Sequence, residues 1–181
     1  MAILAGIGAS DLSHRYKKYT RYIQVGIILL FFPIMLRIIS LHPNQNVYLN
    51  PLIGGLKGAQ VRNFPDWGVT LGTVYRQGTV WLNRHAEPNA KLTLVKGLLA
   101  NIPRHQLRQD IVFLPDLFSG EAKKGEYIIE VIDYYWLRDV PKDKRAYLET
   151  LEPVFQVAVD EVPILKIWKN DRAHTRKQVV R

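Results

Sequence analysis

Side chains that could bind a metal ion are scarce and widely spaced in this sequence. The chain has five histidines and no cysteine, which excludes disulfides, thiolate nucleophiles and thiolate metal sites. His85 and Glu87 come closest to the spacing of two metal ligands, because residues two apart share one face of a strand. Residues 86–89 are typical of a turn instead, and no third ligand is apparent. We therefore predict neither a metal site nor a bound cofactor.

Paired carboxylates are the second arrangement that could do chemistry. Glu126 and Glu130 have a same-face spacing, as an acid/base pair would, but the wet side of a half-buried strand has the same pattern, and we favour that interpretation. Ser119 lacks the strand–turn–helix setting of an activated serine and has no neighbouring base. The glycine pair at 54–55 does not open a phosphate-binding loop followed by a helix. No step of an enzymatic reaction can be assigned, and we predict that the protein is not an enzyme.

Three large aromatic side chains follow one another at Tyr134, Tyr135 and Trp136. In a strand, consecutive side chains point to opposite faces, so at least one ring would be exposed or covered by another element. Exposed tyrosine and tryptophan suit protein interfaces and sugar platforms. The sequence leaves three roles open for this cluster: packing, contact with a partner protein, or contact with a carbohydrate.

Positive charge is the main electrostatic feature of the chain, whose net charge is +9. Basic residues gather in the segment 15–21 and in the tail 170–181, where anionic headgroups, an acidic partner subunit or solvent would face them. The tail residues that we predict to contact a partner are Arg172, Arg176, Lys177 and Arg181. No nucleic acid is expected, because no recognition module accompanies the basic tail.

Residues 22–41, YIQVGIILLFFPIMLRIISL, form the one segment long and apolar enough to cross a bilayer. About 20 residues at ~1.5 Å each span the ~30 Å hydrocarbon core. A buried helix of a soluble protein is the alternative, but residues 25–36 are apolar all round. Arg37 lies one turn from the end, where its guanidinium can reach the headgroups or pair with another subunit.

The flanking charges predict how this helix is oriented. Four basic residues precede the span closely, whereas only Lys57 follows it closely; the four are Arg15, Lys17, Lys18 and Arg21. Because positive charge is retained inside, we predict a cytoplasmic N-terminus and an uncleaved signal anchor. The expected location is a membrane, most simply the bacterial inner membrane, with the C-terminal domain in the periplasm or outside the cell.

Beyond residue 67 the apolar pattern has a period of two. Short alternating runs are separated by turn residues, at 69–73, 80–82, 92–94, 111–114, 127–135, 155–159 and 165–167. Such spacing predicts an antiparallel β-sandwich. The segment 119–131, in which a glycine turn leads into an aromatic-led strand, resembles the late hairpin of immunoglobulin-like bacterial modules. The resemblance implies an immunoglobulin-like fold and assigns no functional residue. One helix is predicted at 141–151.

These observations predict a mainly β protein with a single N-terminal transmembrane helix. Its expected parts are a cytoplasmic segment (1–21), the membrane helix (22–41), a linker (42–66), an extramembrane β-sandwich (67–169) and a basic tail (170–181). The expected function is that of a non-catalytic accessory or scaffold subunit of a membrane complex. Its partners would be other subunits and the lipid bilayer, contacted through Arg37, the aromatic cluster and the tail. The alternative is a membrane-tethered module that binds an envelope glycan or another ligand.

Overall fold

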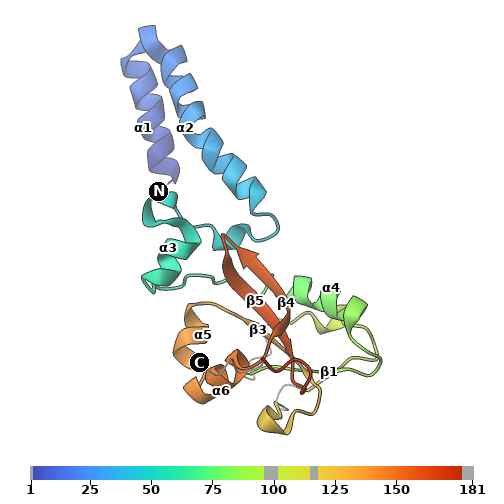
Figure 1. The fold of residues 1–181 in the computed structure, drawn as a ribbon. Helices are drawn as coiled ribbons and strands as arrows, with labels where there is room; N and C mark the ends of the chain where they lie inside the picture. Colours follow the sequence, from blue (N-terminus) through green and yellow to red (C-terminus); the bar gives the residue numbers. More distant parts are fainter. Residues whose placement is uncertain (1, 96–101, 115–117, 177–181) are drawn as a thin grey trace. The chain divides into compact units, whose positions relative to one another are not determined.

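The computed structural model describes residues 2–95, 102–114 and 118–176, and the chain divides into two units, residues 1–45 and 46–181 (Figure 1). The first unit holds two α-helices, and the second holds a sheet with further helices. Each unit has its own internal contacts.

The first unit is a pair of contacting helices, α1 (Ala2–Arg15) and α2 (Thr20–Ser40), joined by the 3-10 turn η1 (Lys17–Tyr19). The helical backbone breaks at Tyr16, whose φ of −116° and ψ of 57° are not helical. The Thr20 hydroxyl donates to the Ser13 carbonyl at 3.0 Å and ties the start of α2 to the end of α1. The basic segment 15–21 therefore lies at the turn between the helices.

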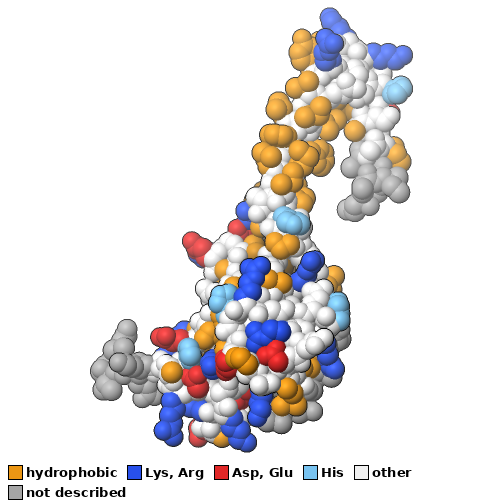
Figure 2. Space-filling view, turned by 90° about the vertical axis from the view of Figure 1, so that its right-hand side faces the viewer, with side chains coloured by type: hydrophobic (Ala, Val, Ile, Leu, Met, Phe, Trp, Pro, Cys, Tyr) orange, Lys and Arg blue, Asp and Glu red, His pale blue; other side chains and the backbone are white. Residues whose placement is uncertain are grey.

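Helix α2 is long and apolar enough to cross a membrane by its length and composition. None of its described side chains is buried, unlike the core helix of a soluble protein. Figure 2 shows hydrophobic side chains in a nearly continuous band along it, with Lys and Arg gathered at the turn between α1 and α2. Pro33 lies inside the helix, which membrane helices tolerate.

The second unit is built on a mixed five-stranded sheet of order β2-β1-β3-β5-β4. Its strands are β1 (Lys91–Thr93), β2 (Val112–Phe113), β3 (Tyr127–Val131), β4 (Pro153–Val159) and β5 (Val162–Lys169). Strand β1 pairs in parallel with β2 and β3, whereas β5 pairs antiparallel with β3 and β4. Strand β3 is thus the middle strand, with Ile128 opposite Trp168 in β5.

Helices cover both faces of this sheet (Figure 1). Helix α4 (Tyr75–His85) covers one face, and helices α5 (Tyr134–Asp139) and α6 (Lys142–Glu149) cover the other. The unit also contains helix α3 (Gly55–Val61). Its 3-10 turns are η2 (Gln45–Val47), η3 (Pro51–Ile53), η4 (Arg104–Gln106) and η5 (Gly120–Ala122). A side chain at Gly78 would meet Ile129 at 2.5 Å and Leu165 at 3.1 Å, so glycine lets α4 approach the sheet closely. On the opposite face, Trp168 stacks on Trp136 with ring centroids 6.1 Å apart.

The predicted mainly β, immunoglobulin-like sandwich is wrong. The chain is 48% helical and 17% strand, and the described strands form one sheet with parallel pairs, not two antiparallel sheets. The segment 42–66, predicted to be a linker, contains α3 and two 3-10 turns. β1 is joined to β2 and β3 by long connections, and such connections allow parallel pairing. Strands of two or three residues carry no sequence signal of the direction in which they pair.

Two predicted strands are helical for identifiable reasons. Residues 80–82 alternate only across a short window, whereas the buried positions Tyr75, Gly78, Thr79 and Leu82 follow the helical spacing of three and four. The predicted strand 127–135 ends at Val131, and the aromatic cluster lies in α5.

Substitutions in α4 separate the two assignments of residues 80–82. A strand would place Val80 and Leu82 on one face, but in α4 Leu82 is 0% exposed and Val80 is 40% exposed. We expect Leu82→Ala to lower the free energy of unfolding by about 2–5 kcal/mol. Val80→Ala, the matched control, should change it by less than about 0.5 kcal/mol. Urea denaturation followed by tryptophan fluorescence measures both, since all four tryptophans lie in the second unit. Equal losses at the two positions would contradict the helix.

Candidate functional site

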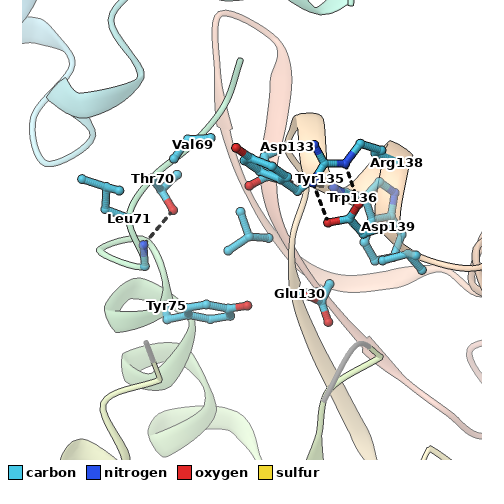
Figure 3. Close-up of a pocket in the computed structure, with 13 residues that line it drawn as sticks. Val69, Thr70, Leu71, Tyr75, Glu130, Asp133, Tyr135, Trp136, Arg138 and Asp139 are labelled. Atoms are coloured by element: carbon cyan, nitrogen blue, oxygen red, sulfur yellow. Dashed lines mark hydrogen bonds and ion pairs between the residues drawn. The ribbon is translucent and has the colours of Figure 1, made fainter. Parts of the chain in front are cut away.

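One pocket in the second unit is an open cavity of about 400 Å³ beside the carboxyl end of β3. Three segments line it: the loop 69–72 with Tyr75, the end of β3, and α5 with the residues on either side of it. Figure 3 shows the loop and Tyr75 on one side of the pocket and the α5 side chains on the other. Segments far apart in sequence therefore meet at one end of the sheet.

The loop 69–72 forms the rim of the pocket, and this rim loop has an unusual backbone conformation. Leu71 has a φ of 51°, a left-handed conformation that branched or bulky residues rarely adopt, and its side chain is 75% exposed. The Thr70 hydroxyl accepts the Gly72 N–H at 3.3 Å and closes the loop (Figure 3). Such conformations persist where the surrounding structure holds them, and they concentrate at binding sites.

Asp133 directs the chain from β3 into α5. Its backbone is extended, and its Oδ1 accepts the Trp136 N–H at 2.8 Å, the bond expected of a helix N-cap. A Cβ added at Gly68 would lie 3.3 Å from the Cα of Asp133, so a side chain there would be crowded. The φ of 73° at Gly68 also favours glycine. The start of α5 is also joined to the segment just before the rim loop, because the Tyr134 N–H donates to the Trp67 carbonyl at 3.0 Å.

The exposed side of α5 presents an aromatic and charged surface to the pocket. Tyr135 donates its hydroxyl to Asp66 at 2.6 Å, and this hydrogen bond raises the pKa of Tyr135. The Arg138 guanidinium lies over the Tyr135 ring, 4.6 Å from its centroid, and bonds Asp139 at 2.6 Å. The hydrogen bond that Arg138 donates to Asp139 raises the pKa of Arg138. These contacts hold the Tyr135 ring in one orientation at the pocket wall.

Two buried polar groups form the inner part of the pocket. Glu130 accepts the Val95 N–H at 3.0 Å through its Oε2, and only 7% of the residue is exposed. Tyr75 is buried near it. Burial and the negative charge of Glu130 raise the pKa of Tyr75 well above its usual range, so its hydroxyl stays protonated.

The pocket therefore combines flat rings with hydrogen-bonding groups of net negative charge. Its rings are Tyr75, Tyr135 and Trp136, and its charged side chains are Glu130, Asp133, Asp139 and Arg138. Carboxylate oxygens accept hydrogen bonds from hydroxyl or ammonium groups, and the faces of the rings offer apolar contact. This arrangement suits a small hydroxylated or cationic ligand better than an anion.

The structure brings some of the predicted partner-binding residues together. Tyr135 and Trp136 line the pocket, whereas Tyr134 does not. Arg176 lines a second, smaller cavity on the other side of Trp136. Arg37 lies in the last turn of α2, Arg172 is exposed on the tail, and Lys177 and Arg181 lie outside the described residues.

The structure gives other roles to the two pairs considered for chemistry, His85 with Glu87 and Glu126 with Glu130. His85 stacks on Trp81, and Glu87 pairs with Lys169 at 2.9 Å. No group of three or more His, Asp or Glu side chains that could hold a metal occurs in the described part of the chain. Glu126 and Glu130 are both buried, so their assignment to the wet side of a strand is wrong.

Sequence reasoning missed most of the pocket. Tyr75, Glu130 and Asp139 come from separate elements, and nothing in the sequence joins them. Asp133 did carry a signal, because an aspartate three residues before a helical amide is a common N-cap.

Comparison with protein-family models, with curated proteins and with solved structures found no match to this chain. The geometry of the second unit is therefore the basis for its function.

At the amino end of β3, Glu126 belongs to a buried hydrogen-bond cluster. Its Oε1 accepts the Asn170 amide at 2.9 Å and the Ser119 hydroxyl at 2.6 Å, while Tyr147 donates to Asn170 at 2.7 Å. Burial alone would raise the pKa of Glu126, but the hydrogen bonds from Asn170 and Ser119 outweigh it and lower the pKa below 4.5. The ionised carboxylate thus joins the segment before β3 to the end of β5.

This cluster predicts acid sensitivity. A carboxyl whose pKa is lowered by folding stabilises the fold above its unfolded value of 4.5 and loses that contribution as the pH falls through the folded value. We expect Glu126→Gln to cost about 1–3 kcal/mol at neutral pH and to flatten the loss of stability below pH 4.5. Denaturation curves at stepped pH measure this, with the exposed Glu152→Gln as control. An unchanged pH profile in Glu126→Gln would contradict the prediction.

Proposed function

We propose that this chain is a membrane-anchored binding module whose second unit holds a small hydroxylated ligand of the saccharide class. The observation that carries the proposal is the pocket at the carboxyl end of β3, where three aromatic rings, three carboxylates and one guanidinium meet. Pockets of about 300–1,000 Å³ lined by rings and a few oriented polar groups are typical of small-ligand sites.

The chemistry of the lining favours a saccharide. The C–H faces of a sugar ring contact aromatic rings, and its hydroxyls donate to carboxylates. Three carboxylates beside one guanidinium disfavour an acidic ligand by like-charge repulsion. The exposed, left-handed Leu71 at the rim supports a binding role, because such a conformation is otherwise costly, by about 1–3 kcal/mol.

Membrane attachment and its direction are part of the proposal. Helix α2 would span the bilayer, with the basic turn at 15–21 on the cytoplasmic side. The second unit would then lie across the membrane from that turn, in the periplasm if the membrane is a bacterial inner membrane. Arg37 would lie near the opposite headgroups.

A second function, accessory subunit of a membrane complex, is favoured by apolar side chains exposed along the segment 51–64. Leu52 is 92% exposed, Val61 79% and Phe64 49%. Exposed side chains of this kind are typical of contact with a partner protein or a membrane surface. If the pocket binds no saccharide, this second function becomes the one that the exposed surface supports.

Saccharide binding is tested with the full chain in lipid nanodiscs, because many detergents carry sugar headgroups. Saturation-transfer NMR with neutral, amino and acidic saccharides should detect binding of neutral or amino sugars and weak or no binding of acidic ones. Tyr135→Ala should weaken that binding tenfold or more, which is a loss of about 1.4 kcal/mol. Leu137→Ala is the matched control, since Leu137 is exposed on the same helix and does not line the pocket. Absence of binding, or equal effects of the two variants, would contradict the proposal.

Orientation is tested by cysteine labelling, for which the cysteine-free chain is a clean background. A membrane-impermeant maleimide added to intact spheroplasts should label Arg84→Cys in the second unit. It should label Lys18→Cys, in the basic turn, only after the membrane is permeabilised. The reverse pattern would show that the orientation is inverted.

A further inference from the structure

A second cavity, of about 120 Å³, lies on the α5–α6 side of the sheet and is rich in cationic side chains. Arg145 and Glu149 of α6, Lys166 of β5 and Arg176 of the tail line it. The parallel indole rings of Trp136 and Trp168 form a wall. Three positive side chains and one carboxylate thus surround a space smaller than the first pocket.

The cations of this cavity form no salt bridge within the described part of the chain, although the carboxylate of Glu149 lines the cavity with them. No salt bridge joins Arg145, Lys166 or Arg176 to a carboxylate there. The Nε of Arg145 is buried and has no hydrogen-bond partner. A buried N–H donor is usually paired, so the Nε of Arg145 is available to donate to an acceptor that enters the cavity.

Backbone hydrogen bonds hold the segments that carry these side chains in place around the cavity. The Arg176 N–H donates to the Thr150 carbonyl at 2.8 Å, and Leu151 forms a bridge with Thr175, which ties the tail to the end of α6. Lys166 is fixed in β5, opposite Glu130 of β3. Burial and the positive charge of Arg176 lower the pKa of Lys166, and Glu149 offsets this in part.

We propose that this cavity binds a phosphate group. Guanidinium groups match the oxygens of phosphate with paired N–H donors, and a lysine adds a point charge. The lining carries two more positive than negative charges, which balances a phosphate monoester of about −1.5 to −2 better than a carboxylate of −1. The indole wall excludes water on one side and strengthens the attraction.

The proposal concerns a different ligand group from that of the first pocket and does not depend on it. The two sites share Trp136 as a wall, but their linings have opposite net charge. The phosphate could be free or part of a phospholipid headgroup, and both sources present the same oxygens.

The test is a calorimetric titration of inorganic phosphate into the full chain in nanodiscs of a zwitterionic lipid. Saturable binding is expected, weaker at high salt because charge pairing is screened. Lys166→Met and Arg176→Gln should each weaken it tenfold or more. Arg172→Gln, on the same tail but outside the cavity, should not. Circular dichroism of each variant shows that the fold is retained; because Arg176 is exposed, its variant tests the site even if Lys166→Met unfolds.

A second arm identifies the source of the phosphate. Nanodiscs that contain phosphatidic acid should compete with inorganic phosphate if the natural ligand is a headgroup, and should leave its affinity unchanged if the ligand is free phosphate. No saturable binding of phosphate, or equal losses in Arg172→Gln and Arg176→Gln, would overturn the proposal.

Discussion

The burial of β3 on both faces is the constraint on which the second unit depends. Ile128 and Ile129 are each 0% exposed, so the strand needs cover on both sides of the sheet. α4 supplies the cover on the Ile129 side, and α5 and α6 supply it on the other side, where Trp136 stacks on Trp168 opposite Ile128. Each isoleucine contributes about 1.5–3 kcal/mol of burial. The glycine at position 78 is part of the same constraint, since it allows α4 to reach the sheet.

Both candidate sites follow from where β3 begins, ends and pairs. Its carboxyl end delivers Glu130 and, through the Asp133 cap, the ring and charge cluster of α5. Its antiparallel neighbour β5 delivers Lys166 to the cationic cavity on the α6 side. Glu130 and Lys166 are cross-strand neighbours, so the acidic, aromatic pocket and the basic cavity adjoin on this face of the sheet, and Trp136 lines both. Linings of opposite net charge favour two ligand groups of different chemistry.

The sequence predicted where strands lie better than how they pair. All five strands and helix α6 lie where alternating runs and the helical pattern were found, and α2 lies along the apolar segment. Helix α4 was missed because its apolar stripe includes a glycine and a threonine, Gly78 and Thr79. Helix α5 was missed because its rings continue the pattern of β3, and only the Asp133 cap marks the change. The parallel pairing of β1 could not be predicted from the sequence, because β1 and β2 are too short to indicate which strands they pair with.

The same limit applies to the sites. Tyr135, Trp136 and Arg176 could be identified as binding candidates because consecutive rings and clustered charge are visible locally in the sequence. Arg145 and Lys166 could not, and Glu130 was considered only as half of an acid/base pair, because only the sheet register and the α5–α6 turn bring these residues close to the rings. A site that depends on the fold has no local sequence signature, and both candidate sites of this chain are of that kind.

The most direct test of this account is hydrogen–deuterium exchange of the intact chain, resolved by peptide. If β3 is the buried middle strand, the amides of 127–131 and of 164–168 should exchange most slowly in the second unit, and the rim loop 69–72 should exchange quickly. Exchange of 127–131 as rapid as that of the rim loop would show that β3 does not organise the fold, and the account of both sites would fail with it.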